Sequence, residues 1–324
     1  MNLKNHVDYD DDFDDTELNK HHRIETRRAY ARLTTRMVDD ANRFKQAQTD
    51  FRGGFKFTYQ PARFEEWWLL TSLGELYEHQ WIGDVLRRVK SGKEASVYQC
   101  QAGTAAGGGL AAAKVYRPWS LRNMRKDHVY RQGRADLDDE GRVIIDHGKL
   151  HAIEKKTEYG CQLLHESWIA YEFRTLQGLR GAGADVPEPF TMANNTILMG
   201  FVGDRERCAP SLSEVGLGHD EARRLFERVL RNIDTLLSQA RIHGDLSAFN
   251  ILYWKGAITL IDFPQVVSPH DNPQAYPIFQ RDLQRVCEYF ARQGVHADAR
   301  RLAMEMWEAR GYRLREARGD DQEL

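Results

Sequence analysis

The hydrophobic and polar positions in the middle of the chain follow two spacings, one typical of strands and one typical of helices. Short apolar runs of strand length lie at 85–98, with a break at Ser91-Gly92, and at 110–116, 196–202, 251–253 and 258–261. The last two runs flank Lys255-Gly256, which predicts a β-hairpin. We therefore expect two strands joined by a turn at Ser91-Gly92, a third strand linked to them by a glycine-rich connection, a buried strand and a separate hairpin.

Helical spacing is clearest over 219–240. Apolar residues recur there at steps of three and four: Leu225, Phe226, Val229, Leu230, Ile233, Leu236, Leu237 and Ala240. Similar patterns predict helices over 166–179, 282–293 and 297–309, and 67–81 is typical of buried helical or strand-capping material.

Two stretches are dominated by charge. Residues 8–15 hold six aspartates in eight positions, and basic residues follow between 20 and 45. We interpret these as a solvated tail and a weakly anchored basic helix, which either stays solvated or contacts RNA or an acidic partner. The long, highly charged segment 117–166 predicts a loop that is functional or disordered.

Composition narrows the class of protein. Of 324 residues, 41% are hydrophobic and 10% aromatic, which is enough for a sizeable core. Lys plus Arg number 46 and Asp plus Glu 48, so the net charge of −2 argues against a surface built wholly for polyanions. The four cysteines are scattered without a CxxC pair, which excludes a zinc ribbon, and there is no signal pattern and no membrane-length apolar run. We expect a soluble, cytoplasmic protein.

Charged residues in two of the apolar segments suggest an anion site. Lys114 lies in the middle of an Ala/Val strand, where an unpaired ammonium is costly to bury, so it needs a carboxylate or a phosphate. Glu172, amid aromatic residues on the predicted helix 166–179, is a candidate partner. The small residues of the turn at 91–97 would let backbone N–H groups approach phosphate oxygens.

The strongest chemical signal is a spacing near the predicted hairpin. His243-Gly244-Asp245 is followed by Asn250, and Asp262 comes after the hairpin. This order puts Asp245 and Asn250 on one loop and brings Asp262 alongside. Two carboxylates and an amide suit Mg²⁺ or Mn²⁺ bridging phosphates, with Asp245 free to accept the proton of an attacking hydroxyl.

The spacing resembles the H-R-D-x-x-x-x-N and D-F-G set of protein kinases, with Gly244 in place of the arginine and Pro264 in place of the glycine. It is more closely similar to the RIO family of atypical serine/threonine protein kinases. That resemblance, from about residue 82 to 293, is carried by Ser-Gly-Lys-Glu-Ala-Ser-Val-Tyr at 91–98, Ile-His-Gly-Asp-Leu-Ser-Ala-Phe-Asn-Ile-Leu at 242–252 and Ile-Asp-Phe-Pro-Gln-Val-Val at 261–267.

The resemblance implies an α+β, bilobed protein-kinase-like fold, with a small β-rich N-lobe and a larger, mostly helical C-lobe. RIO proteins lack the activation segment and peptide-docking helices of other protein kinases, in agreement with the short segment after Asp262 and the absence of A-P-E. We expect an N-terminal extension over 1–65, an N-lobe and hinge over 66–203 with a flexible loop at 117–166, a C-lobe over 204–310 and a tail over 311–324.

The resemblance also implies an ATP and Mg²⁺ site, with Mn²⁺ as an alternative ion. Asp245 would be the catalytic base, and Asn250 and Asp262 the metal ligands. Lys114 would hold the α- and β-phosphates and pair with Glu172. Residues expected to contact ATP are Ser91, Gly92, Lys93, Glu94, Ala95, Ser96, Val97, Lys114, Glu172, Met199, Phe201 and Val202. Gly200 stands where RIO hinges often carry glutamate, so that side-chain contact to the nucleotide is not expected.

Three hypotheses about function stay open. The leading one is a non-specific serine/threonine protein kinase that transfers the γ-phosphate to proteins, itself included, with Ser120 as a candidate self-phosphorylation site. The second is a small-molecule kinase of the aminoglycoside or choline type. The third is an ATPase switch in ribosome assembly, in which the basic stretches 20–45 and 117–134 contact RNA. The protein substrate is not identifiable from the sequence.

Overall fold

The computed structural model describes residues 55, 57–117, 130 and 132–313. These lie in one compact unit that begins at Phe55. The predicted acidic tail, the basic helix, most of the basic stretch 117–134, Ser120 and most of the C-terminal tail lie outside the described residues. No helix in the described ranges is both long and apolar enough to cross a bilayer.

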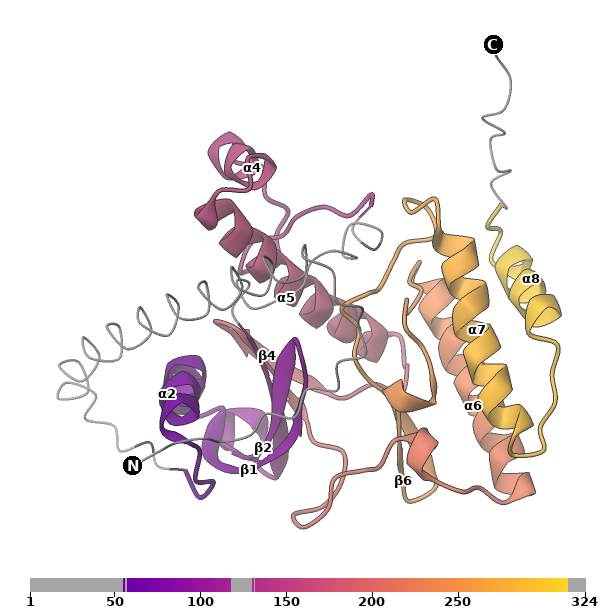
Figure 1. The fold of residues 1–324 in the computed structure, drawn as a ribbon, viewed down its shortest axis with the longest axis horizontal. Helices are drawn as coiled ribbons and strands as arrows, with labels where there is room; N and C mark the ends of the chain where they lie inside the picture. The colour runs from indigo at the N-terminus through magenta and orange to yellow at the C-terminus, as the bar shows by residue number, and fades with distance from the viewer. Residues whose placement is uncertain (1–54, 56, 118–129, 131, 314–324) are drawn as a thin grey trace, which may run out of the picture. The chain divides into compact units, whose positions relative to one another are not determined.

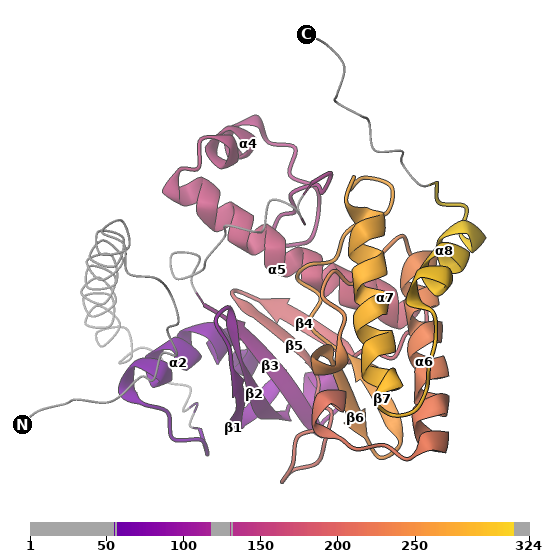
Figure 2. The ribbon, with the colours of Figure 1, turned by 45° about the vertical axis from the view of Figure 1, so that its right-hand side comes forward.

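The N-terminal half of this unit is built around a five-stranded antiparallel sheet (Figure 2). Its spatial order is β1-β2-β3-β5-β4. The strands are β1 (Ile82–Ser91), β2 (Ala95–Ala102), β3 (Leu110–Tyr116), β4 (Pro189–Ala193) and β5 (Thr196–Gly200). The strand predictions at 85–98, 110–116 and 196–202 are thus confirmed, although the first turn lies between Ser91 and Ala95, one or two residues later than predicted.

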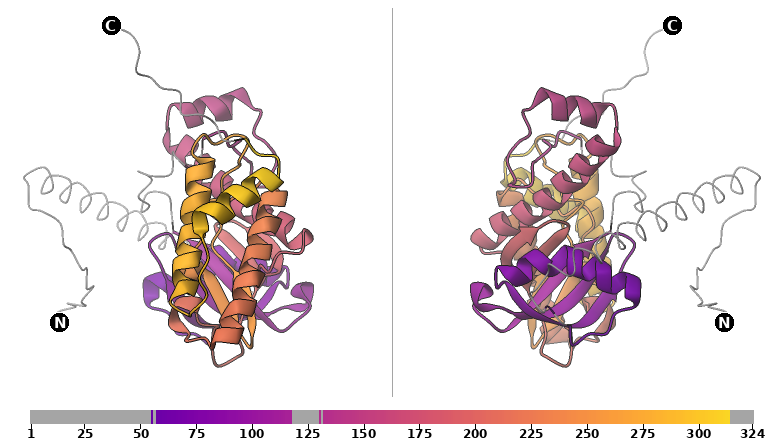
Figure 3. Two further views of the ribbon diagram at one scale, coloured as in Figure 1. Left: turned by 90° about the vertical axis from the view of Figure 1, so that its right-hand side faces the viewer. Right: turned by 90° about the vertical axis from the view of Figure 1, so that its left-hand side faces the viewer.

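Alternation along β3 gives the sheet two different apolar faces. Ala111, Ala113 and Val115 pack with Leu69, Leu73 and Leu76 of α2 (Arg63–Glu78). Ala112 and Tyr116 instead join a larger core with α5 (Glu158–Gly181) and the C-terminal elements. Because side chains alternate between the two faces of a strand, Lys114 shares the second face with Ala112 and Tyr116. The helix α2 lies across the sheet in the right-hand view of Figure 3.

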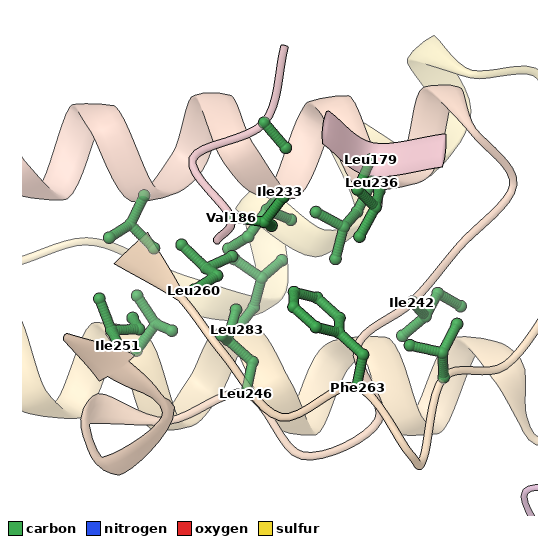
Figure 4. Close-up of a cluster of buried hydrophobic side chains, with 14 of the residues drawn as sticks. Leu179, Val186, Ile233, Leu236, Ile242, Leu246, Ile251, Leu260, Phe263 and Leu283 are labelled. Atoms are coloured by element: carbon green, nitrogen blue, oxygen red, sulfur yellow. The ribbon is translucent and has the colours of Figure 1, made fainter. Parts of the chain in front are cut away.

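The C-terminal half is mostly helical, with α6 (His219–Ser238), α7 (Ala275–Ala291) and α8 (Ala299–Ala309) lying near one another (Figure 1). A two-stranded hairpin, β6 (Ile251–Trp254) and β7 (Ala257–Leu260), precedes α7. Figure 4 shows the core here, where side chains of α6, the hairpin and α7 meet around Phe263, which is fully buried. The predicted helix 219–240 and hairpin are confirmed.

The predicted loop over 117–166 needs correction, because helices occupy its second half. Helix α4 (His147–Glu154) begins after Asp146, whose carboxylate accepts a 2.8 Å bond from the Lys149 backbone N–H. Helix α5 begins eight residues before the predicted start at Glu166, with Thr157 capping the Gly160 N–H at 3.0 Å. The Asp146 cap, rather than apolar spacing, marks α4, since this helix buries no residue, whereas the Thr157 cap marks only where the already predicted α5 begins.

Candidate active site

A buried ion-pair group forms where β3 faces α5. The Nζ of Lys114 lies 2.7 Å from Oε1 of Glu172 and 2.6 Å from Oδ1 of Asp262. The other oxygen of Glu172 accepts a 2.5 Å hydrogen bond from the Tyr116 hydroxyl. The Glu172 side chain is 1% exposed and that of Lys114 12%, whereas that of Asp262 is 46% exposed. Three charges therefore converge, and only the Asp262 side chain is open to solvent to a large extent.

Electrostatics within this group favour the charged forms of Lys114 and Asp262. Burial on its own would lower the pKa of Lys114, but Asp262 and Glu172 outweigh it and hold the pKa well above its usual value. Burial would raise the pKa of Asp262, but the Lys114 ammonium lowers it below its usual value. Burial and the neighbouring Glu172 carboxylate raise the pKa of Tyr116, so its hydroxyl remains a donor.

Asp245 and Asn250 lie at the two ends of one loop. The Asn250 amide nitrogen donates to the backbone carbonyl of Asp245 at 2.9 Å, which closes the loop, and Asn250 is 9% exposed. His243, just before Asp245, places Nε2 3.1 Å from the carbonyl oxygen of Ile261. That contact ties the loop to the residue before Asp262. The structure thus brings Asp245, Asn250 and Asp262 together, as the motif spacing predicted, and the same cavity is lined by Lys114 and Glu172.

The glycine in place of the kinase arginine has a steric reason. Gly244 has φ +85°, in the region that glycine adopts readily, and a Cβ at this position would lie 2.0 Å from the carbonyl oxygen of Gln265. Its N–H donates to the Asp282 carboxylate at 2.8 Å, and its carbonyl accepts a bond from Arg281. The loop that carries Asp245 therefore lies directly against the segment after Asp262, and its backbone is hydrogen-bonded to α7.

The donor chemistry fits a magnesium ion held partly by phosphate. The Asn250 amide uses its nitrogen to close the loop, so its oxygen is the atom left as a ligand beside the half-exposed Asp262 carboxylate. No group of three or more His, Cys, Asp or Glu suited to a metal exists within the residues that the model describes. A site with so few protein ligands suits Mg²⁺, which keeps waters and phosphate oxygens in its coordination shell. Asn250 and Asp262 would hold it.

A cavity of about 760 Å³ contains most of the predicted nucleotide contacts. Its walls include Gly92, Lys93 and Glu94 of the turn, Ala95 and Val97 of β2, the charged group, the hinge residues Met199, Phe201 and Val202, and Asp245 and Asn250. Ser91 and Ser96 are absent from these walls. Their hydroxyls lie 3.3 Å apart; the Ser96 side chain is buried at 3% exposure, whereas Ser91 is exposed, so its contact with the nucleotide stays a prediction.

Three residues in direct contact with the predicted site have no role predicted for them from the sequence. Tyr116 binds Glu172, Arg285 binds Asp245 with 2.7 Å between Nη1 and Oδ1, and Asp282 binds the Gly244 N–H. Tyr116 could have been identified, because it lies two residues after Lys114 and therefore on the same face of the strand. The other two lie on α7, far along the chain, and only the fold reveals them.

Comparison with known proteins agrees with this geometry. The family model described as RIO domain matches residues 96–302. The human serine/threonine-protein kinase RIO1 is 31% identical over 208 residues, which are 64% of this chain and 33% of the human protein. The RIO-type serine/threonine-protein kinase Rio1 of Haloferax volcanii is 30% identical over 212 residues, which are 65% of this chain and 64% of that protein.

A third relative, the serine/threonine-protein kinase rio1 of Schizosaccharomyces pombe, is 29% identical over 213 residues and 39% of its own length. The chain thus spans between about a third and two thirds of the length of these relatives. The family match nevertheless covers most of the chain described here and contains Lys114, Glu172, Asp245, Asn250 and Asp262. This chain therefore belongs to the RIO family and has its protein-kinase-like fold.

Proposed function

We propose that the chain is an ATP-dependent serine/threonine protein kinase that transfers the γ-phosphate of ATP with the help of Mg²⁺. The observation that carries the proposal is the convergence of Lys114, Asp245, Asn250 and Asp262 on one cavity of about 760 Å³. These relatives are named serine/threonine-protein kinases, which favours a protein acceptor over an antibiotic or choline. A cytoplasmic location stays a prediction from the sequence.

The residues of the chain divide the work of transfer between them. Lys114, fixed by Glu172, would lie against the phosphates, and the turn at 92–97 would cover them. Asp245 would accept the proton of the acceptor hydroxyl while that oxygen attacks the γ-phosphorus, and ADP would leave. When bound, Mg²⁺ supplies positive charge that neutralises the phosphates, and Asn250 and Asp262 would hold it. Catalysis would then rest on positioning and charge, with no covalent intermediate on the protein.

The test uses the purified chain with γ-³²P-ATP and Mg²⁺, measuring both labelled protein and free phosphate. We expect the wild type to label itself or an added protein, and Asp245→Ala and Asp262→Ala to lose the activity while remaining folded. Asp220→Ala, a fully exposed aspartate at the start of α6, is the matched control and should keep it. Normal transfer by either site variant would refute the assignment.

The same assay separates the other hypotheses. Release of free phosphate without labelled protein would support the ATPase switch instead. Labelling of an aminoglycoside or of choline, without labelled protein, would support the small-molecule kinase.

A further inference from the structure

The two carboxylate oxygens of Asp245 have different partners. Oδ1 accepts a charge-assisted hydrogen bond from Nη1 of Arg285 at 2.7 Å. Oδ2 lies 3.4 Å from the Asn250 amide nitrogen, which is too long for a strong hydrogen bond. One oxygen is therefore held, and the other is left to accept a proton from a further group.

The same helix that provides Arg285 also fixes the backbone at Asp245. Arg281 and Asp282 of α7 hold the carbonyl and the N–H of Gly244, the residue before Asp245. Arg285 lies one helical turn after Arg281, so both side chains project from one face of α7. One turn of helix α7 therefore binds the backbone of the loop, and the next turn binds the Asp245 carboxylate.

No lysine or arginine lies between Asp245 and Asn250 in the sequence, so the loop has no cation of its own. Lys114 is already bound to Glu172 and Asp262. The positive charge beside Asp245 thus comes from α7.

This ion pair is too exposed to contribute much to stability. The side chains of Arg285 and Asp245 are 40% and 44% exposed. Pairs exposed to this extent are worth only about 0–1 kcal/mol. Removing the arginine should therefore change the orientation of Asp245 more than it changes the stability of the fold.

We propose that Arg285 is a positioning residue that holds Asp245 at Oδ1, so that Oδ2 is presented to the hydroxyl of the protein acceptor. The inference rests on the proposed kinase function. Without Arg285 the carboxylate can rotate about its side-chain bonds, and the fraction of molecules with a correctly placed base falls. ATP would contact Lys114 and the hinge, so its binding should not depend on this contact.

The experiment compares Arg285→Met, Arg285→Gln and Arg285→Lys with wild type by kcat, KM for ATP and the thermal unfolding midpoint. We expect both neutral variants to lose about tenfold or more in kcat, with KM for ATP changed by less than about twofold. Arg285→Lys, which keeps the charge, should recover part of the loss. Arg292→Met, at the exposed C-terminal end of α7, is the matched control and should behave as wild type.

A neutral variant of Arg285 that is folded and keeps the wild-type kcat would overturn the inference. So would a lysine variant as slow as the neutral ones, or a loss confined to KM for ATP. Arg285→Gln, the milder change, decides the matter if Arg285→Met does not fold. A wild type that transfers no phosphate refutes the proposed function, whereas an active wild type with unaffected neutral variants refutes this inference alone.

Discussion

Replacing Gly244 with alanine tests whether the loop around Asp245 must lie in close contact with the segment after Asp262. The added Cβ would lie 2.0 Å from the Gln265 carbonyl oxygen and 2.8 Å from its carbonyl carbon. Ordinary contacts between such atoms begin near ~3.5 Å, so one of the two segments must move by about 1 Å or more. Asp245 comes directly after Gly244, and Asp262 lies three residues before Gln265. The movement should therefore increase the distance between the two carboxylates.

Two costs add in this variant. A non-glycine residue in the left-handed region costs roughly 1–2 kcal/mol, and overpacking a well-filled site costs roughly 1–3 kcal/mol. The expected loss in the free energy of unfolding is therefore about 2–5 kcal/mol, and the unfolding midpoint should fall by roughly 5–15 °C. A displacement near ~1 Å at a catalytic group can cost ~100-fold in rate, so phosphotransfer should fall by about that factor.

The matched control is Gly109→Ala. Gly109 has the same φ of +85°, but a Cβ there meets nothing within 4 Å, so this variant carries the backbone cost without the clash. Thermal unfolding and γ-³²P-ATP assays on both variants separate the backbone cost from the cost of overpacking. The reasoning is refuted if Gly244→Ala is no less stable than Gly109→Ala and transfers phosphate at the wild-type rate.

Two further predictions concern the charged group. Tyr116→Phe leaves Oε2 of the buried Glu172 without its donor, which should cost about 1–3 kcal/mol and lower the unfolding midpoint; an unchanged midpoint would mean that the hydroxyl contributes nothing. The lowered pKa of Asp262 implies that its pairing with Lys114 stabilises the fold above the unfolded pKa near ~3.9 and that this contribution is lost as pH falls through the lower folded pKa. Asp262→Asn should therefore unfold at a lower temperature than wild type at pH 7, with the difference shrinking below about pH 4; a difference that grows in acid would contradict the assignment.

Local sequence patterns predicted the features that depend on interactions between residues close together in the chain. The apolar stripe of α6 and the turn at Lys255-Gly256 each depend on residues a few positions apart, and both were confirmed. The motif spacing placed Asp245, Asn250 and Asp262 together for the same reason, since a hairpin of fixed length joins them. The cost of burying an unpaired lysine pointed to Lys114 and to Glu172 as its candidate partner, and the family resemblance agreed, although the pair joins residues 58 positions apart.

Contacts that depend on packing between distant elements could not be predicted. Arg285 and Asp245 lie 40 positions apart, and an arginine on a helix resembles any solvated charge until α7 is docked beside the loop. Helix α4 was missed for a different reason. It buries no residue, so it has no apolar stripe to detect, and only the cap at Asp146 signals its start.

The alternation along β3 limits how this strand can vary. Val115 lies in the core with α2, and its neighbours Lys114 and Tyr116 lie on the opposite face. An insertion or deletion of one residue before Lys114 would turn the ammonium into the α2 core and Val115 toward Glu172, because a shift of one position exchanges the two faces of a strand. Changes in chain length are accommodated far more easily in the connection 103–109, where a Cβ added to any of three consecutive glycines would meet nothing within 4 Å.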